Sequence, residues 1–453
     1  MLDLPKHKDV IMAGYLLNVG YLALLVLCSP LLLYAAVCKG KYRAGFAAKF
    51  LGRVPIRSGH RSCVWFHAVS VGEVQLVAPI VAKLRERLPE LQIVISTTTH
   101  TGYAVAKRKY DCHTVFYCPL DFTWSTAVAM RRIRPSVVVL AELELWPNLV
   151  RAARRYGSKV AVVNGRLSDH SFRGYLRIRP VVSRLLKSIN LVAAQNQTYA
   201  DRFLRLGAEP AAVHVTGSVK FDGAQSDRAN PRTAALRELA GIAAEDVVFL
   251  AGSTQHPEES IALESFLAAK ETDRRLRLIL VPRHPERFEE VARLLEQSGE
   301  LWQRRTALDP TNVGRGERRI LLVDTVGELG DWWGAAAIGF VGGSLGSRGG
   351  QNMIEPAAYG AAVCFGPNTK NFRDVVASLL AHDAAKVVRD KSELTEFVHR
   401  CLGERDFAAG LGRRAAKLAA GSCGATDATV SLLMNLVAKE SGSEGLDAPL
   451  RAA

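Results

Sequence analysis

Short apolar runs, each followed by a stretch with helical periodicity, recur along most of this chain. Five precede residue 225 and five follow it, at 64–68, 92–97, 137–141, 159–163, 191–194, 246–251, 276–281, 320–323, 338–341 and 362–365. Continuous apolar runs of this length are typical of parallel strands that helices cover on both faces. The pattern therefore predicts an α/β fold with two doubly wound, Rossmann-like sheets.

The two sets of strands predict two domains. A polar segment, residues 222–232, separates them and contains Asn230-Pro231, which is typical of a hinge. We predict one Rossmann-like domain over residues 51–225 and a second over 226–438, with a central cleft between them. Residues 439–453 are small and polar, and this composition predicts a flexible tail.

The N-terminal segment has a different pattern, because no charged residue occurs from Val10 to Cys38. About 20 apolar residues suffice to cross a bilayer. We predict a membrane anchor within residues 1–50, which either spans once with a kink at Pro30 or lies in one leaflet. A cleaved signal peptide is the competing interpretation, but the run is long and lacks a clear cleavage site. Basic residues follow the run and favour the cytoplasmic side, namely Lys39, Lys41, Arg43, Lys49 and Arg53.

Composition and charge narrow the class of partner. Of 453 residues, 48% are hydrophobic and 23% charged, which excludes a disordered chain or a many-pass membrane protein as a description of the whole. Lys and Arg number 59 against 44 Asp and Glu, and the net charge of +15 indicates an anionic partner: nucleic acid, anionic lipid or a phosphorylated substrate. The eight cysteines contain no C-x-x-C pair, so we predict neither a disulfide framework nor a metal site.

Ligands of such folds bind beyond the carboxyl ends of the strands. In the first half of the chain, Glu73, the pair Glu142 and Glu144, and Lys220 follow apolar runs. Glu73 is interpreted either as a general base or as a helix cap. The carboxylate pair either binds a cation or substrate, or it belongs to a solvated loop. Lys220 is either a site residue or an ordinary surface lysine.

Four strand ends in the second half have chemistry that suits phosphate or ribose. The small residues 252–254 can offer backbone N–H groups to a phosphate, and Arg283 can bind one through its planar guanidinium. The segment 324–329 follows the next strand, and the glycines at 342–343 lead to Glu355, which can accept ribose hydroxyls. Four such loops predict a nucleotide site. No G-x-G-x-x-G follows the first strand, which argues against NAD.

Eight segments together carry a family resemblance. They read FHAVSVGE (66–73), ELELWPN (142–148), AAQN (193–196), VTGSVKFD (215–222), LVPRHPERF (280–288), DTVGEL (324–329), FVGGSL (340–345) and RGGQNMIEP (348–356). In this order they resemble the 3-deoxy-D-manno-octulosonic acid (Kdo) transferases, which build the inner core of lipopolysaccharide. The resemblance extends from the anchor to about residue 435.

The resemblance implies a GT-B glycosyltransferase of the cytoplasmic side of the inner membrane. It implies transfer of Kdo from CMP-Kdo to a phosphorylated lipid A precursor (lipid IVA), with inversion and without metal, cofactor or nucleic acid. The first domain is expected to bind the acceptor and the second CMP-Kdo. By motif, Glu73 is the base that deprotonates the acceptor hydroxyl, and Glu142 and Lys220 stabilise the transition state. From its charge, we expect Lys220 to face the carboxylate of Kdo. The implied CMP-binding residues are Pro282, Arg283, Val326, Gly327, Glu328, Asn352, Met353, Ile354 and Glu355.

Some positions depart from the family pattern. Gln351 replaces the usual His, Met353-Ile354 replaces Pro-Leu, Val326 replaces Met, and the segment 255–258 reads Gln-His-Pro-Glu instead of His-Glu-Gly-Glu. These changes concern the lining of the CMP pocket. Two alternatives remain: a GT-B transferase for another nucleotide sugar or acceptor, and a non-catalytic membrane-anchored nucleotide-binding protein. Intact Glu73 and Lys220 weigh against both.

Overall fold

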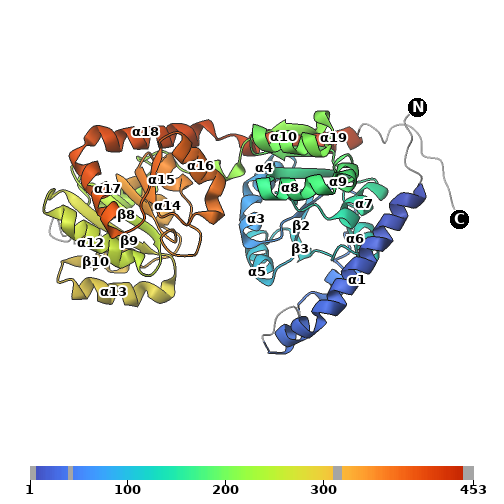
Figure 1. Ribbon diagram of the computed structural model, residues 1–453, viewed down its shortest axis with the longest axis horizontal. Helices are drawn as coiled ribbons and strands as arrows, with labels where there is room; N and C mark the ends of the chain where they lie inside the picture. Colours follow the sequence, from blue (N-terminus) through green and yellow to red (C-terminus); the bar gives the residue numbers. More distant parts are fainter. Residues whose placement is uncertain (1–6, 39–43, 310–318, 442–453) are drawn as a thin grey trace. The chain divides into compact units, whose positions relative to one another are not determined.

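The structure, a computed structural model, describes residues 7–38, 44–309 and 319–441 (Figure 1). It divides into two compact units. The first comprises the chain up to Asp222 together with the segment from Cys423 onward, and the second comprises Gly223–Ser422. Three of the basic residues predicted to flank the anchor, Lys39, Lys41 and Arg43, and most of the predicted tail lie outside the described residues.

The first unit is built on a seven-stranded parallel sheet with the order β3-β2-β1-β4-β5-β6-β7. Because the chain proceeds outward in opposite directions from the neighbouring strands β1 and β4, their carboxyl ends form a topological switch point. The strands are β1 (Cys63–His67), β2 (Gln92–Thr97), β3 (Thr114–Tyr117), β4 (Val137–Ala141), β5 (Lys159–Gly165), β6 (Leu191–Ala194) and β7 (Val213–Val215). The helices between them are α3 (Val71–Leu76), α4 (Ala78–Arg87), α5 (His100–Lys109), α6 (Thr123–Ile133), α7 (Pro147–Arg155), α8 (Asp169–Arg177), α9 (Arg179–Leu186) and α10 (Gln197–Leu206).

The second unit repeats this plan with the order β10-β11-β9-β8-β12-β13-β14. Its switch point lies between β8 and β12. The strands are β8 (Val247–Thr254), β9 (Leu276–Pro282), β10 (Trp302–Arg304), β11 (Ile320–Leu322), β12 (Ile338–Val341), β13 (Ala362–Phe365) and β14 (Ala385–Val387). Its helices are α11 (Pro231–Leu239), α12 (Glu258–Lys270), α13 (Phe288–Gln297), α14 (Leu329–Trp332), α15 (Ile354–Ala358), α16 (Arg373–Ala381), α17 (Lys391–Gly403) and α18 (Arg405–Gly421).

The predicted α/β fold with two doubly wound sheets is confirmed, and each of the ten predicted apolar runs coincides with a strand. The four strands that the apolar pattern did not identify, β3, β7, β10 and β14, form the edges of the two sheets. Three of them span only three residues and are partly exposed. An edge strand pairs on one side only and needs less apolar surface, so its sequence carries a weaker signal.

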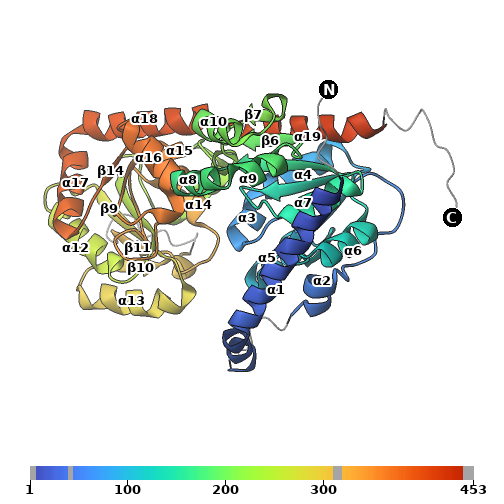
Figure 2. The same cartoon turned by 45° about the vertical axis from the view of Figure 1, so that its right-hand side comes forward.

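The domain limits differ from the prediction at the C-terminus. Helix α19 (Ala425–Ser441) packs on α4 and β5 of the first unit, and both views show it beside α4 (Figures 1 and 2). Val430, Leu433 and Val437 are buried in the core of that unit. Residues 423–438 therefore do not belong to the second domain, because the apolar face of α19 covers the first sheet.

Two further helices precede the first sheet. Helix α1 (His7–Cys38) is long and apolar, and α2 (Phe46–Leu51) packs on α6. The segment Gly14–Leu31 of α1 is the single stretch of the described chain that is long and apolar enough to cross a membrane. Most of its side chains are exposed, whereas Asn18 is buried against α6 and α7.

Candidate active site

Glu73 lies in the first turn of α3, beyond the carboxyl end of β1. Its backbone N–H donates to Ser70 Oγ (3.4 Å), and the Ser70 hydroxyl donates to Glu73 Oε1 (2.9 Å). The backbone N–H of Val69 donates to Glu73 Oε2 (2.8 Å). This reciprocal capping box fixes the carboxylate, so the helix-cap interpretation is confirmed. Capping does not exclude catalysis, because each oxygen keeps a second lone pair.

The environment of Glu73 suits a proton acceptor. Burial raises the pKa of Glu73, the hydrogen bonds from Val69 and Ser70 oppose this, and the negative charge of Glu142 raises the pKa further. A carboxylate with a raised pKa binds a proton more strongly than an ordinary one, which favours general-base catalysis. The assignment of Glu73 as the base stays a prediction.

Glu142 leaves β4 with a left-handed backbone, φ +53°. For a residue other than glycine this conformation costs about 1–3 kcal/mol, and such residues cluster at functional sites. Glu142 Oε1 lies 3.6 Å from Lys220 Nζ, and Oε2 lies 3.7 Å from the guanidinium of Arg166. The structure therefore brings together two of the three predicted catalytic residues and adds Arg166. The sequence signal for Arg166 was its place directly after a strand.

Lys220 is held from the neighbouring strand. It lies in a short 3-10 turn, Val219–Phe221, and the N–H of Val219 donates to Asn164 Oδ1 (3.1 Å) at the end of β5. Asn164 also has a left-handed backbone, φ +52°. Two strained residues, Glu142 and Asn164, thus end two adjacent strands and orient the ion pair between Glu142 and Lys220.

Glu144 completes a cluster of three carboxylates. Its Oε2 accepts a hydrogen bond from Trp146 Nε1 (3.1 Å). Burial raises the pKa of Glu144 to about 7, and the charges of Glu73 and Glu142 contribute. Like charges near a strand end raise each other's proton affinity. The site therefore contains a carboxyl group that changes charge near neutral pH.

In the second unit, Arg283 is exposed directly after the buried Pro282 that ends β9. Its backbone N–H donates to the carbonyl of Thr254 (3.0 Å) on the neighbouring strand. Burial raises the pKa of Glu355, and the positive charge of Arg283 opposes this shift. Arg283 and Glu355, distant in sequence, therefore lie in one region of this unit.

Glu328 has a strong partner that the sequence did not indicate. Arg305 donates two parallel hydrogen bonds to its carboxylate, both 2.9 Å, and Thr325 Oγ1 donates a third at 2.8 Å. The neighbouring Val326 is 78% exposed, and Gly327 has φ +97°. Glu328 thus fixes the turn, while Val326 presents an apolar side chain to solvent.

The segment 352–355 is held by its own side chains. Asn352 Nδ2 donates to Glu355 Oε1 (2.9 Å), and Asn352 Oδ1 accepts from the N–H of Ile354 (3.1 Å). Met353 and Ile354 are almost fully buried. Of the predicted nucleotide-binding residues, these two therefore have side chains in the core, and only their backbone can face a ligand.

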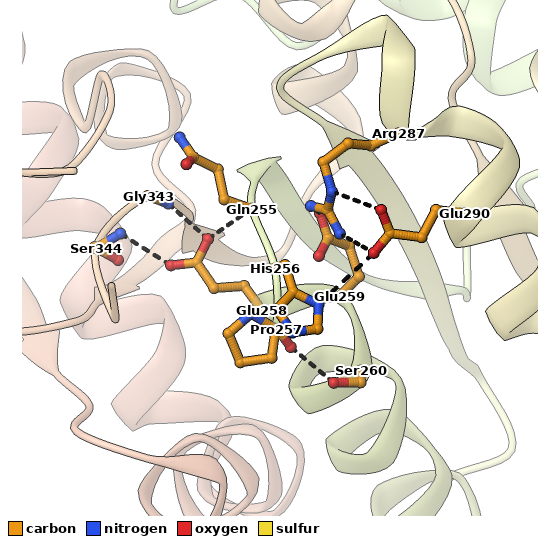
Figure 3. A network of polar contacts seen from close by, with 10 residues as sticks. All are labelled: Gln255, His256, Pro257, Glu258, Glu259, Ser260, Arg287, Glu290, Gly343 and Ser344. Carbon is orange, nitrogen blue, oxygen red and sulfur yellow. Dashed lines mark hydrogen bonds and ion pairs between the residues drawn. The ribbon is translucent and has the colours of Figure 1, made fainter. Parts of the chain in front are cut away.

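The glycine loop after β12 is hydrogen-bonded to a buried carboxylate. Its N–H groups at Gly343, Ser344 and Leu345 donate to the buried carboxylate of Glu258. The N–H of Gln255 also donates to this carboxylate, and Figure 3 shows the bonds from Gly343, Ser344 and Gln255. These donors are already used within the protein. In this loop these three N–H groups are therefore not available to a phosphate.

Comparison with known proteins agrees with the resemblance. A family model described as 3-deoxy-D-manno-octulosonic-acid transferase (kdotransferase) matches residues 41–223. The 3-deoxy-D-manno-octulosonic acid transferase of Bordetella pertussis is 34% identical over 387 residues, which cover 82% of this chain and 86% of that protein. The transferase of the same name from Haemophilus influenzae is 32% identical over 386 residues, covering 83% and 88%.

A solved structure supports the fold. The glycosyltransferase of Rickettsia africae superposes with a TM-score of 0.53 at 12% identity and covers 85% of this chain and all of that one. At this identity the likeness concerns the fold alone, whereas the relatives above settle the family. The chain belongs to the Kdo transferase family, and it is a glycosyltransferase with the GT-B fold predicted from its sequence.

Proposed function

We propose that this enzyme transfers Kdo from CMP-Kdo to a phosphorylated lipid A precursor, with inversion and without a metal ion. The cluster of Glu73, Glu142, Lys220 and Arg166 at the switch point of the first unit carries the proposal. It combines a fixed carboxylate of raised proton affinity with an ion pair held by strained backbone. A protein that only binds a nucleotide has no need of this combination.

The proposed reaction is a single displacement. The acceptor hydroxyl loses its proton to Glu73, and its oxygen forms a bond to the anomeric carbon of Kdo while the bond from that carbon to the phosphate of CMP breaks. CMP leaves with the bonding electron pair. Attack opposite to the leaving group inverts the anomeric carbon. Lys220 is suited to the carboxylate of Kdo, and Arg283 to the departing phosphate, because each is a cation that can offset the negative charge of the group it would face.

Helix α1 is suited to one leaflet of a membrane. Asn18 Nδ2 donates to Thr123 Oγ1 (2.7 Å), and Tyr21 donates to Asp121 (3.2 Å), so this part of α1 is attached to the first unit. The chain is attached again at α2, where Trp124 Nε1 donates to the carbonyl of Phe50 (2.9 Å). Between these attachments the exposed apolar side chains include Leu22, Leu24, Val26, Leu27, Leu31 and Leu33.

The two attachments argue against a full crossing. From Tyr21 to Cys38 an α-helix extends about 25 Å, which is less than the hydrocarbon thickness of about 30 Å. The chain from Cys38 back to Ala44 reaches about 21 Å at most, and it includes three basic residues that hydrocarbon does not accept. We therefore propose that α1 enters the cytoplasmic leaflet and does not cross the inner membrane, near the lipid acceptor.

The test is transfer from CMP-Kdo, generated in situ, to tetraacylated lipid A precursor, followed by mass spectrometry. The wild type, Glu73→Gln and the control Glu86→Gln are compared in detergent with EDTA. Glu86 is an exposed residue of α4. A gain of one or more Kdo masses in the wild type and the control, reduced about 10²–10⁴-fold in Glu73→Gln, supports the proposal. CMP binding without any gain of mass contradicts it.

A further inference from the structure

Glu258 is a buried carboxylate at the switch point of the second unit. It begins α12, directly after β8, and is 1% exposed. Its Oε2 accepts from the N–H groups of Gln255 (2.9 Å) and Gly343 (2.6 Å), and its Oε1 from those of Ser344 and Leu345 (both 2.9 Å). Four backbone donors from the ends of two adjacent strands thus converge on one carboxylate.

Successive N–H groups that point at one centre form a nest, which in many proteins binds the phosphate of a ligand. Here the anion in the nest is part of the chain (Figure 3). A buried charge is tolerated when hydrogen bonds replace its hydration, and four charge-assisted bonds do so for Glu258. The nest is therefore filled before any ligand arrives.

Glycine is required where the loop approaches this carboxylate. A Cβ on Gly342 would lie 2.6 Å from the Cα of Thr254 and 2.8 Å from Oε2 of Glu258. Contacts this short force the backbone to move. The glycine at 342 thus serves the close approach of the loop to β8 and Glu258.

The opposite side of the loop holds the segment assigned to CMP. The carbonyl of Gly343 accepts from the N–H of Gly350 (2.8 Å), which directly precedes residues 351–355. The carbonyl of Ser344 accepts from the N–H of Asn368 (2.9 Å), and that of Leu345 from Asn368 Nδ2 (3.1 Å). A continuous set of hydrogen bonds therefore leads from Glu258 through the loop to Gly350.

We propose that Glu258 is a positioning residue of the donor site. Its carboxylate permanently fills the glycine nest, and the loop thereby fixes residues 350–355 instead of binding the donor phosphate through these N–H groups. The proposal deepens the proposed function, on which the assignment of 352–355 to CMP depends. It leaves phosphate binding to cations such as Arg283.

The next residue supplies a matched control. Glu259 is also 1% exposed and lies in the same first turn, but it pairs with Arg287 (2.5 Å) and makes no hydrogen bond to the loop within the described part of the chain. Figure 3 shows the two carboxylates directed to different partners. Replacing either one by glutamine removes one buried negative charge, and only Glu258→Gln affects the nest.

The experiment uses the full-length protein in detergent. Calorimetry measures the Kd of CMP, and hydrogen–deuterium exchange measures protection of residues 342–346. Glu258→Gln is expected to raise the Kd about 10- to 100-fold and to accelerate exchange in this segment at least tenfold. Glu259→Gln is expected to leave both within about twofold. Glu258→Asp keeps the charge on a shorter side chain and is expected to show intermediate values, which decide the question if Glu258→Gln does not accumulate.

Two results would overturn the proposal. Tighter CMP binding in Glu258→Gln would show that the vacated nest takes the phosphate. Equal exchange of residues 342–346 in Glu258→Gln, Glu259→Gln and the wild type would show that Glu258 does not hold the loop. If the wild type binds no CMP, the proposed function fails, while the exchange measurement still decides whether Glu258 positions the loop.

Discussion

The switch points of the two units use carboxylates in opposite ways. In the first unit, Glu142 is partly exposed and faces the side-chain cations Lys220 and Arg166 at 3.6–3.7 Å, longer than a hydrogen bond. In the second, Glu258 is buried and saturated by backbone N–H groups at 2.6–2.9 Å. A partly exposed charge with long contacts can exchange them for contacts with a substrate. A buried charge whose hydrogen bonds are all made within the protein can only stabilise the structure. The carboxyl edges of the two sheets thus differ, because one holds a carboxylate that stays open to a ligand and the other holds a carboxylate that supports structure.

The largest expected effect concerns Lys220, in the cluster with Glu142 and Arg166. Lys220→Met removes the cation while keeping the chain length, and we expect kcat/KM to fall about 10²–10³-fold because transition-state charge loses its partner. The melting temperature should change by less than about 2 °C, since a partly exposed ion pair contributes at most about 1 kcal/mol. The control is Lys187→Met at an exposed position. If Lys220→Met lowers kcat/KM by less than tenfold, Lys220 does not act on the substrate, and the difference proposed between Glu142 and Glu258 fails.

One glycine from each switch point tests whether the loop that binds Glu258 is packed more tightly than the start of α3. Gly342→Ala is expected to lower the free energy of unfolding by about 1–3 kcal/mol, because its Cβ meets the backbone of Thr254 at 2.6 Å. Gly72→Ala in α3 has open space, with the nearest atom, Ser70 Oγ, at 3.9 Å. It should be neutral or stabilising by up to about 1 kcal/mol. Thermal unfolding of the two variants measures the difference, and equal melting temperatures would contradict the comparison.

The smallest expected effect is a pH dependence of stability from Glu144. Because burial raises its pKa from 4.5 to about 7, its contribution to stability is fully present below pH 4.5 and is lost as the pH rises through 7. Relative to Glu144→Gln, the wild type should lose roughly 0.5–1 kcal/mol per pH unit in this window, after allowance for solvent screening of a half-buried group. Denaturant unfolding at pH 4.5, 6 and 8 checks this, with Glu86→Gln as control. If the difference in unfolding free energy between the wild type and Glu144→Gln is the same at all three pH values, folding does not raise the pKa of Glu144.

The sequence predicted the interior strands of each sheet better than it predicted which side chains pair with one another. Central strands have continuous apolar runs, so they could be identified, whereas the edge strand β10 reads Trp-Gln-Arg. The meeting of Glu142 and Lys220 was predicted through family motifs. Arg166 was not predicted although it directly follows β5, and Arg305 was not predicted because its pairing with Glu328 leaves no local signal in the sequence.

Glu258 shows a second limit of sequence reasoning. Its segment was recognised as a departure from the family pattern, but the sequence could not show that three N–H groups more than 80 positions away would converge on it. The wrong domain assignment of α19 has the same cause, because its contacts are distant in sequence. Its apolar residues indicate a buried face, and only the folded chain shows which sheet that face covers.

The return of α19 to the first unit bears on how the newly made chain folds. Asp222, the last residue of this unit before the crossover, accepts hydrogen bonds from the N–H groups of Gly424, Ala425 and Thr426 and so caps the helix that comes back. Because the ribosome makes the whole second unit between Asp222 and this helix, the sheet face that α19 covers stays open until the second unit has been made. The second unit, continuous from Gly223 to Ser422, can fold before the first is finished, which reverses the usual order of domain folding during translation.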